Sequence, residues 1–432
     1  MRSAERHPSE VDLLALALAP ELPRGAHVTG CPACRRKVEG LATGREHLAD
    51  LDGLALEDGV EPAPAPIRNV GRVLSDAEAL VRAAEQGEET FVAALAEAES
   101  RDGFAEVALH AVQIASRLAV RSPRRSEVFA TRIRLALAPA LRADSPTARL
   151  AEAASRVLES QGQLYVGRAE DAVRNALEGV SVLESENAPL LLLSQARYYA
   201  GSTLWGASRY EESLRLLETA RDGFASDGQE SWVGRAEGAI GLVHFSEARF
   251  LRALRAFDAA LARLDSSVDP GPVASIEQNR AGILMNLGRQ TEARAAFGAA
   301  LELALRHGLT TSATSIRVNL LNLGLDERAY EEVRSRGEKV VAQCDRDGLA
   351  VDGYYARLAL AEAQAALGNY GAVHKLLEAL RRDAPPEVRD DPDATVLLAR
   401  LDAGDQDETA DRLKRLRHYL AGRDRYQAAS RA

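Results

Sequence analysis

The residues of this chain that are best suited to chemistry lie close together near its start, in the stretch HVTGCPAC. His27, Cys31 and Cys34 supply an imidazole nitrogen and two thiolates, which are the ligands that zinc prefers. A tetrahedral site needs a fourth ligand, and both His7 upstream and His47 downstream are available. The alternative is that the two cysteines are buried or redox-active thiols and that His27 is an ordinary surface residue. The chain has only 3 cysteines, which argues against a disulfide framework and favours a reducing compartment.

The surroundings of the two cysteines favour their thiolate form. Pro32 fits the first turn of a helix, which places both thiols near the positive end of a helix dipole. Arg35, Arg36 and Lys37 follow directly. A thiolate binds zinc, and it is also the form that oxidants attack. The sequence is therefore compatible both with a structural zinc site and with a redox switch that releases zinc.

The segments HPSEVDLLALAL, which begins at His7, and HVTGCPACRRKVEGL, which begins at His27, carry a family resemblance. Together they resemble the zinc-binding anti-sigma domain, whose mark is a leading His or Cys followed by HxxxCxxC. The resemblance implies that His7 is the first zinc ligand, His27 the second, and Cys31 and Cys34 the third and fourth. It also implies that the module binds a sigma factor and covers the surface that the sigma factor presents to RNA polymerase.

A proline-rich segment separates this module from the rest of the chain. The sequence LEDGVEPAPAPIRNVG has three prolines within five positions and no apolar period, which is typical of a linker. We therefore expect a zinc-binding helical module at residues 1–50, a linker at 51–74 and a helical repeat domain at 75–432.

The long part behind the linker repeats itself. Each copy begins with a small residue at a turn, followed two, five and nine positions later by an often aromatic, a small or β-branched, and an apolar residue. The third members of successive copies are separated by steps of 41, 40, 40, 36 and 44 residues, and a period in this range is typical of a solenoid. The copies are Gly167, Ala169, Ala172, Ala176; Ser208, Tyr210, Ser213, Leu217; Ala248, Phe250, Ala253, Phe257; Gly288, Gln290, Ala293, Phe297; Gly324, Asp326, Ala329, Val333; and Gly368, Tyr370, Val373, Leu377.

This pattern resembles the tetratricopeptide repeat (TPR) over residues 75 to 420. The segments ASRYEES, which ends at Ser213, and GNY, which ends at Tyr370, are similar to that family's turn into its second helix. Gly201 and Gly241 match its small first-helix position. Helix-forming residues dominate, and aromatic residues make up only 5% of the chain. We predict an all-α fold: a small helical zinc-binding module and a right-handed TPR-like α-solenoid.

The two ends of the repeat domain depart from the pattern. Residues 75–160 fit the register poorly, and we interpret 101–119 and 126–142 as one divergent helix pair. Residues 407–425 are expected to form a polar capping helix with a solvated basic face. The basic residues of that face are Arg412, Lys414, Arg415 and Arg417.

In a TPR-like solenoid, the first helices of successive pairs line an inner surface. Here these helices carry polar side chains that can hydrogen-bond an extended peptide or an acidic segment. The alternative is that the same side chains only solvate a groove. The predicted partner-binding residues are Arg197, Tyr198, Asn279, Arg280, Asn286, Arg317, Asn319 and Asn322.

Composition excludes several classes of function. The formal net charge of −10 argues against direct nucleic-acid binding. No run of 18 or more apolar residues predicts a membrane span, and no apolar segment follows the start as in a secretory signal, so we expect a cytoplasmic protein. The sequence has no phosphate-binding glycine loop, no nucleophile elbow and no HExxH motif. No catalytic residue is predicted, and we expect a binding protein rather than an enzyme.

Two hypotheses about function follow from these observations. In the first, the zinc module binds a sigma factor while the TPR-like solenoid binds a second partner or senses a signal. In the second, the chain is an interaction scaffold, or an accessory subunit of a separate enzyme, and its zinc module is only structural.

Overall fold

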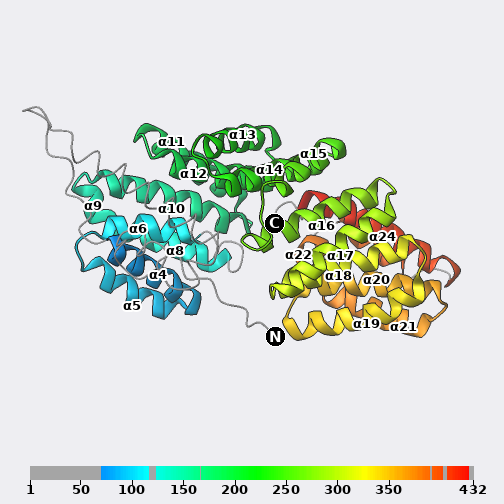
Figure 1. The fold of residues 1–432 in the computed structure, drawn as a ribbon. Helices are drawn as coiled ribbons and strands as arrows, with labels where there is room; N and C mark the ends of the chain where they lie inside the picture. The colour runs from blue at the N-terminus through cyan, green and yellow to red at the C-terminus, as the bar shows by residue number, and fades with distance from the viewer. Residues whose placement is uncertain (1–69, 116–122, 166, 390–391, 402–405, 428–432) are drawn as a thin grey trace, which may run out of the picture. The chain divides into compact units, whose positions relative to one another are not determined.

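The computed structural model describes residues 70–115, 123–165, 167–389, 392–401 and 406–427, and these residues form helices and no strand. The chain divides into two compact units, Met1–Asp76 and Ala77–Ala432. Of the first unit, the described part is the start of α4 (Val70–Gln86). The account below concerns the second unit, most of whose helices are labelled in Figure 1. No helix built from the described residues combines the length and the apolar character that crossing a bilayer requires.

A series of helix pairs makes up most of the second unit. From α12 onward the first helices begin at residues 190, 230, 270, 310 and 350, so the repeat is 40 residues long. The first helices are α10 Pro146–Tyr165, α12 Leu190–Gly206, α14 Glu230–Ser246, α16 Pro270–Asn286, α18 Thr310–Asp326 and α20 Ala350–Ala366. The second helices are α11 Ala169–Ser185, α13 Tyr210–Ser226, α15 Phe250–Leu261, α17 Gln290–Arg306, α19 Tyr330–Asp347 and α21 Tyr370–Arg382.

Shorter helices precede the pairs: α5 Glu88–Glu99, α6 Phe104–Ile114, α8 Pro123–Ala136 and α9 Ala138–Arg142. Helices α6 and α8 both pack against α10, and α5 packs against α6 and α8. The buried rings of Phe91 and Phe129 stack between α5 and α8, with their centroids 5.0 Å apart. These helices attach to the repeats through α10.

Left-handed turn residues set the 40-residue period. At most helix ends one residue has a positive φ, and the next amide donates a hydrogen bond back to a carbonyl five residues earlier, as Arg209 N does to Leu204 O at 2.8 Å. This bond satisfies a carbonyl that the helix end leaves without a partner. From Ser208 to Gly368 these turns recur every 20 residues, except between Ala248 and Gly288, where α15 ends early at Leu261, so two helices fill each repeat. The turn residues are Ser208, Gly228, Ala248, Gly288, Gly308, Arg328, Gly348 and Gly368.

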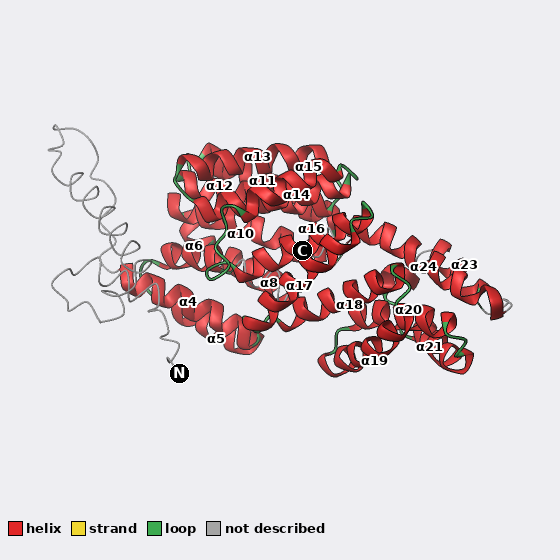
Figure 2. Ribbon diagram, turned by 45° about the vertical axis from the view of Figure 1, so that its right-hand side comes forward, coloured by secondary structure: helices red, strands yellow, loops and turns green. Residues whose placement is uncertain are grey.

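Small residues on the first helices allow the second helices to approach closely. A Cβ added to Gly241 of α14 would lie 2.5 Å from the ring of Phe257 on α15. Phe257 is fully buried and belongs to one apolar cluster with Ile276 and Ile283 of α16. Each cluster of this kind joins one pair to the next, so stacking builds a continuous core from units that cannot bury their apolar faces alone. Figure 2 shows how short the loops between consecutive helices are.

Two boundaries differ from the sequence prediction. Gly324 was assigned to a turn, but it lies inside α18, where an added Cβ would be 2.7 Å from Val333. The turn is at Arg328, with a φ of 59°. With Arg328 in place of Gly324 as the turn residue, the irregular steps of 36 and 44 residues between copies become two steps of 40 residues. Residues 70–74, assigned to the linker, belong to α4.

The C-terminal part consists of α22 Pro386–Arg389, α23 Pro392–Arg400 and α24 Gln406–Gln427. Leu413, Leu416 and Leu420 of α24 are buried in one cluster with Tyr354 and Leu358 of α20. Helix α24 contacts α20 and also α14, three first helices away. Both ribbon views place α24 beside α20 (Figures 1 and 2). The C-terminal helix therefore packs on the first helices of the array.

Candidate functional site

One face of the first helices α12, α16 and α18 is left partly open by the rest of the fold. The sixth, tenth, thirteenth and seventeenth residues of a helix share one face, and in α12, α16 and α18 all of them are half-buried. We call this set, over α12 to α20, the inner stripe. It consists of Gln195, Tyr199, Ser202 and Gly206; Arg235, Ala239, Leu242 and Ser246; Ser275, Asn279, Gly282 and Asn286; Ser315, Asn319, Asn322 and Asp326; and Tyr355, Ala359, Glu362 and Ala366.

The opposite side of the first helices faces the second helices. Arg197, at the eighth position of α12, forms an ion pair with Glu184 of α11 at 2.8 Å. The same position in α14 and α20 forms similar ion pairs with the preceding second helix. Neighbouring first helices contact each other directly, as the bond from Gln278 Nε2 to Ser315 Oγ at 3.2 Å shows. The inner stripe is thus the side of the first helices that the second helices do not cover.

The structure separates the predicted partner-binding residues into two groups. Asn279, Asn286, Asn319 and Asn322 lie on the inner stripe, as the sequence analysis expected, and Tyr198 lies on its flank. The three arginines do not share this face. Their placement differs from the prediction, although whether any of the eight residues binds a partner stays a prediction. The arginines are Arg197, Arg280 and Arg317.

Arg280 shows why an arginine on a first helix need not reach the inner stripe. Its Nε lies 3.0 Å from a carboxylate oxygen of Asp258 on α15, and a second nitrogen lies 3.5 Å from Glu277. Burial raises the pKa of Glu277, although the neighbouring Arg280 opposes this shift. Arg280 therefore connects α16 to the preceding second helix.

The asparagines give the stripe a distinct chemistry. Within the described residues, the side-chain amides of Asn279, Asn319 and Asn322 form no hydrogen bond, and all three are half-buried. Asn286 donates to the carbonyl oxygen of Gly282 at 2.9 Å. An amide side chain both donates and accepts, so consecutive first helices present paired donors and acceptors on one face.

An aromatic cluster borders the N-terminal end of the stripe. The rings of Tyr198 and Tyr199 on α12 meet the ring of Trp232 on α14 edge to face, with centroids 5.6 and 6.1 Å apart. Phe224 of α13 stacks on Trp232, with the ring centroids 5.1 Å apart. Burial raises the pKa of Tyr198, so its hydroxyl stays neutral. Of these rings, only that of Tyr198 was predicted from the sequence as part of a binding surface.

Arg235 adds a fixed positive charge beside this cluster. Its guanidinium carbon lies 4.9 Å from the centre of the Trp232 ring, within the range of a cation–π contact. Arg235 also forms an ion pair with Asp269, which is 3% exposed and accepts a hydrogen bond from Ser231 at 2.7 Å. This group was not predicted from the sequence. The signal available in the sequence was the spacing of Trp232 and Arg235, which are three residues apart in a helical segment and so share one helix face.

A second charged group lies at the C-terminal end of the stripe. Arg417 of α24 donates through Nε to Glu362 at 2.7 Å and through a terminal nitrogen to Asp326 at 2.9 Å. Arg417 and Glu362 are 5% and 3% exposed. The sequence analysis assigned Arg417 to a solvated basic face, and this prediction is wrong, because the guanidinium is buried against two carboxylates of the inner stripe.

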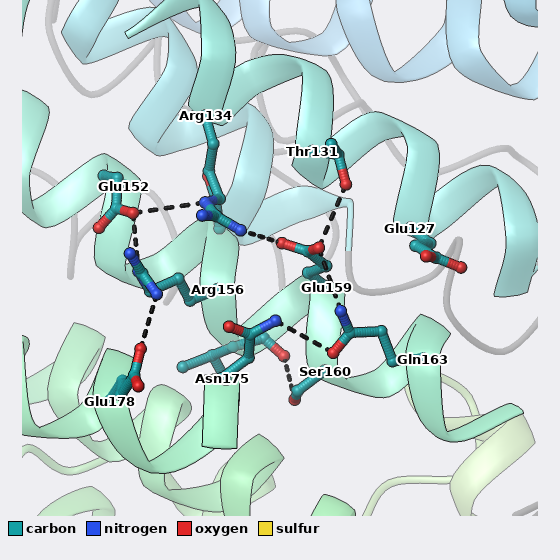
Figure 3. Close-up of polar contacts among 12 residues, drawn as sticks. Glu127, Thr131, Arg134, Glu152, Arg156, Glu159, Ser160, Gln163, Asn175 and Glu178 are labelled. Carbon is teal, nitrogen blue, oxygen red and sulfur yellow. Dashed lines mark hydrogen bonds and ion pairs between the residues drawn. The ribbon is translucent and has the colours of Figure 1, made fainter. Parts of the chain in front are cut away.

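A polar network joins the N-terminal helices to the repeats (Figure 3). Glu159 of α10 forms an ion pair with Arg134 of α8 and accepts a hydrogen bond from Gln163 at 3.1 Å. Arg156 of α10 lies between Glu152 and Glu178, 2.7 Å from each. The carboxylates and arginines of this network pair with one another, so the network connects α8, α10 and α11.

The predicted zinc ligands His7, His27, Cys31 and Cys34 lie outside the described residues. Across the ranges that the structure describes, no group of three or more His, Cys, Asp or Glu side chains could hold a metal ion. Burial, with a smaller effect from Asp352, raises the pKa of Cys344 to about 11. This thiol is therefore protonated at neutral pH and is not an activated nucleophile.

Neither a protein-family model nor a curated protein matches this chain. Among solved structures, the chain is similar to a Rap protein complexed with Competence and Sporulation Factor, with 15% identity, a TM-score of 0.53, and coverage of 84% of this chain and 96% of that one. It is also similar to the apo form of the quorum sensor NprR from B. thuringiensis, with 14% identity, a TM-score of 0.50, and coverage of 82% and 99%. At such identities the similarity concerns the fold alone. The chain has a TPR-like helical-repeat fold, and these comparisons add nothing to the resemblance between residues 7–34 and the anti-sigma domain.

Proposed function

We propose that this protein is a non-enzymatic regulator or scaffold that binds an extended segment of a partner protein along the inner stripe. One observation carries the proposal: the amides of Asn279, Asn319 and Asn322 are half-buried, lie on one face of adjacent helices, and form no hydrogen bond within the described part of the chain. These amides are only half-buried and reach solvent, so a ligand that both donates and accepts can take the place of solvent on them.

The spacing of the stripe suits a peptide backbone. Adjacent packed helices lie about 8–10 Å apart, and an extended chain rises about 3.3–3.6 Å per residue. Asn279 and Asn319 occupy the same position on adjacent first helices, so each can meet about every third residue of a peptide that crosses the helices. Amide groups read the backbone rather than particular side chains, which suits recognition of an extended segment.

The fold comparison supports the same class of function. The Rap protein of the comparison was solved in complex with Competence and Sporulation Factor, so a related fold accommodates a bound factor. Binding of a sigma factor through a zinc module remains a prediction from residues 7–34, because none of those residues is described. We therefore favour the scaffold hypothesis over the anti-sigma hypothesis.

A selection from a library of random linear peptides, displayed on phage and panned against the full chain, tests the proposal. Selected peptides should bind the native chain, and the combined variant N279A/N319A/N322A should weaken binding by about tenfold or more, as expected for losing roughly 1.4 kcal/mol or more of hydrogen bonding. The matched control is Q290A/Q343A, which removes two amides from second helices. If the control weakens binding equally, or if no linear peptide is selected, the stripe is not a peptide site.

A further inference from the structure

Helix α24 lies over the C-terminal end of the inner stripe instead of extending the stack of pairs. Its buried leucines pack on α20, its Arg417 reaches Asp326 of α18, and the helix contacts α14 as well. At 1.5 Å per residue, its 22 residues span roughly 33 Å. The distance from α20 to α14 is three helix spacings of about 8–10 Å, so α24 is long enough to cross these first helices.

The carboxylates that bind Arg417 occupy stripe positions that are neutral in the other pairs. Glu362 stands at the thirteenth position of α20, where the earlier first helices have serine, leucine, glycine and asparagine. Asp326 stands at the seventeenth position of α18, where the earlier helices have glycine, serine and asparagine. From α12 to α20, acidic residues appear on the stripe only in the two helices that Arg417 contacts. The stripe and α24 are therefore matched in charge at this end.

The burial of these charges determines how α24 can leave. Arg417 and Glu362 have side chains that are 6% and 5% exposed, and Nε of Arg417 lies 2.7 Å from a Glu362 oxygen. If α24 left without a replacement, the carboxylates of Glu362 and Asp326 would both lose the Arg417 guanidinium that neutralises them. A segment that brings its own guanidinium can replace Arg417 without leaving a buried charge unpaired.

We propose that α24 is an intrachain occupant of the C-terminal end of the inner stripe and that a partner segment carrying an arginine on an amphipathic helix displaces it. The proposal rests on the proposed function, since it concerns access to the same stripe. The expected partner segment resembles α24 itself, with leucines four residues before, one before and three after the arginine, as Leu413, Leu416 and Leu420 stand around Arg417. Displacement would open the stripe between α18 and α20.

The first test is hydrogen exchange on the full chain and its R417A and R417K variants. R417A should raise exchange in α24 and in the parts of the first helices α14 to α20 beneath it, and leave α10 and α12 unchanged. R417K keeps the charge but loses the planar fork, so it should give a smaller increase. The control is R415A, which removes an exposed arginine of α24 and should change nothing. Exchange that rises throughout the repeats, or does not rise at all in R417A, overturns the proposal.

The second test uses a labelled synthetic peptide of residues 406–427 as the probe. In the native chain the tethered helix has a high effective concentration and excludes the free peptide. The peptide should therefore bind the full-length R417A chain at least tenfold more tightly than the native chain. The same peptide with its own arginine replaced by alanine should not bind, nor should the R417A chain accept the native peptide once E362Q and D326N are added. Equal binding of both peptides overturns the proposal.

The α24-peptide experiment and the library selection together distinguish failure of the proposed function from failure of this inference. If the α24 peptide binds as expected while no library peptide ever binds the stripe, the intrachain contact stands and the proposed function fails. If library peptides bind native and R417A chains with equal affinity, the stripe binds peptides but α24 does not restrict access to it, and this inference fails alone.

Discussion

Replacing Gly241 by alanine should destabilise the protein even though alanine is the better helix former. An added Cβ would lie 2.5 Å from two ring atoms of Phe257 and 3.2 Å from a third. Phe257 is fully buried, so its ring cannot move away into solvent. Overpacking of this kind costs about 1–3 kcal/mol, while exchanging glycine for alanine in a helix gains about 1 kcal/mol. We expect a net loss of about 1 kcal/mol.

Urea unfolding followed by circular dichroism measures this loss, and hydrogen exchange in α14 and α15 shows whether it is local. The matched control is Gly298→Ala in α17, where an added Cβ meets no atom within 4 Å, so the substitution should stabilise by about 1 kcal/mol. In a Phe257→Leu background, Gly241→Ala should cost about 1 kcal/mol less than in the native chain, because the ring atoms are gone. Stabilisation by Gly241→Ala equal to that of Gly298→Ala would refute the assignment of these positions as a packed pair.

The remaining predictions concern metal and pH. We expect about one zinc per chain by elemental analysis, lost in Cys31→Ser and kept in His47→Ala, because a structural zinc site is closed by four protein ligands; full zinc in the cysteine variant would contradict the assignment. We also expect thermal stability to fall as the pH drops from about 7 to about 5. Burial lowers the folded-state pKa of His110, His244 and His418 below the ordinary 6.5, so unfolding takes up protons in this range. His244→Gln should reduce the pH dependence of the melting temperature, and an unchanged dependence would argue against this origin.

The sequence predicted the repeat architecture because turn chemistry and helix packing leave local signals. The turns at Ser208, Ala248, Gly288 and Gly368 were placed correctly, since small or polar residues there are followed by a helical period. The turn at Arg328 was missed because arginine has no preference for positive φ. Gly324 was taken for the turn, although its lack of a side chain serves the contact with Val333. A glycine that packs and a glycine that turns look alike in one sequence.

The candidate site was only partly predictable for a different reason. The position of Asn279 and Asn319 on one helix face follows from helical periodicity, which is local. The burial of Arg417 does not, because it depends on Glu362 and on Asp326, which is 91 residues away. The neighbouring basic residues Arg412, Lys414 and Arg415 made a solvated face the natural interpretation of this segment. Long-range pairing of charges has no period that a single sequence reveals.

The way α24 is held has a consequence for how strongly it competes. Removing one partner of a buried ion pair costs about 3–5 kcal/mol, which corresponds to at least a hundredfold change in an equilibrium. Replacing Arg417 by another guanidinium avoids this cost, whereas a neutral competitor must bear it. The contact of Arg417 with Glu362 and Asp326 therefore discriminates between partner segments by charge as well as by shape. A helix held by leucines alone would yield to any amphipathic segment of similar size, but the Arg417 contact restricts displacement to segments that bring an arginine to Glu362 and Asp326.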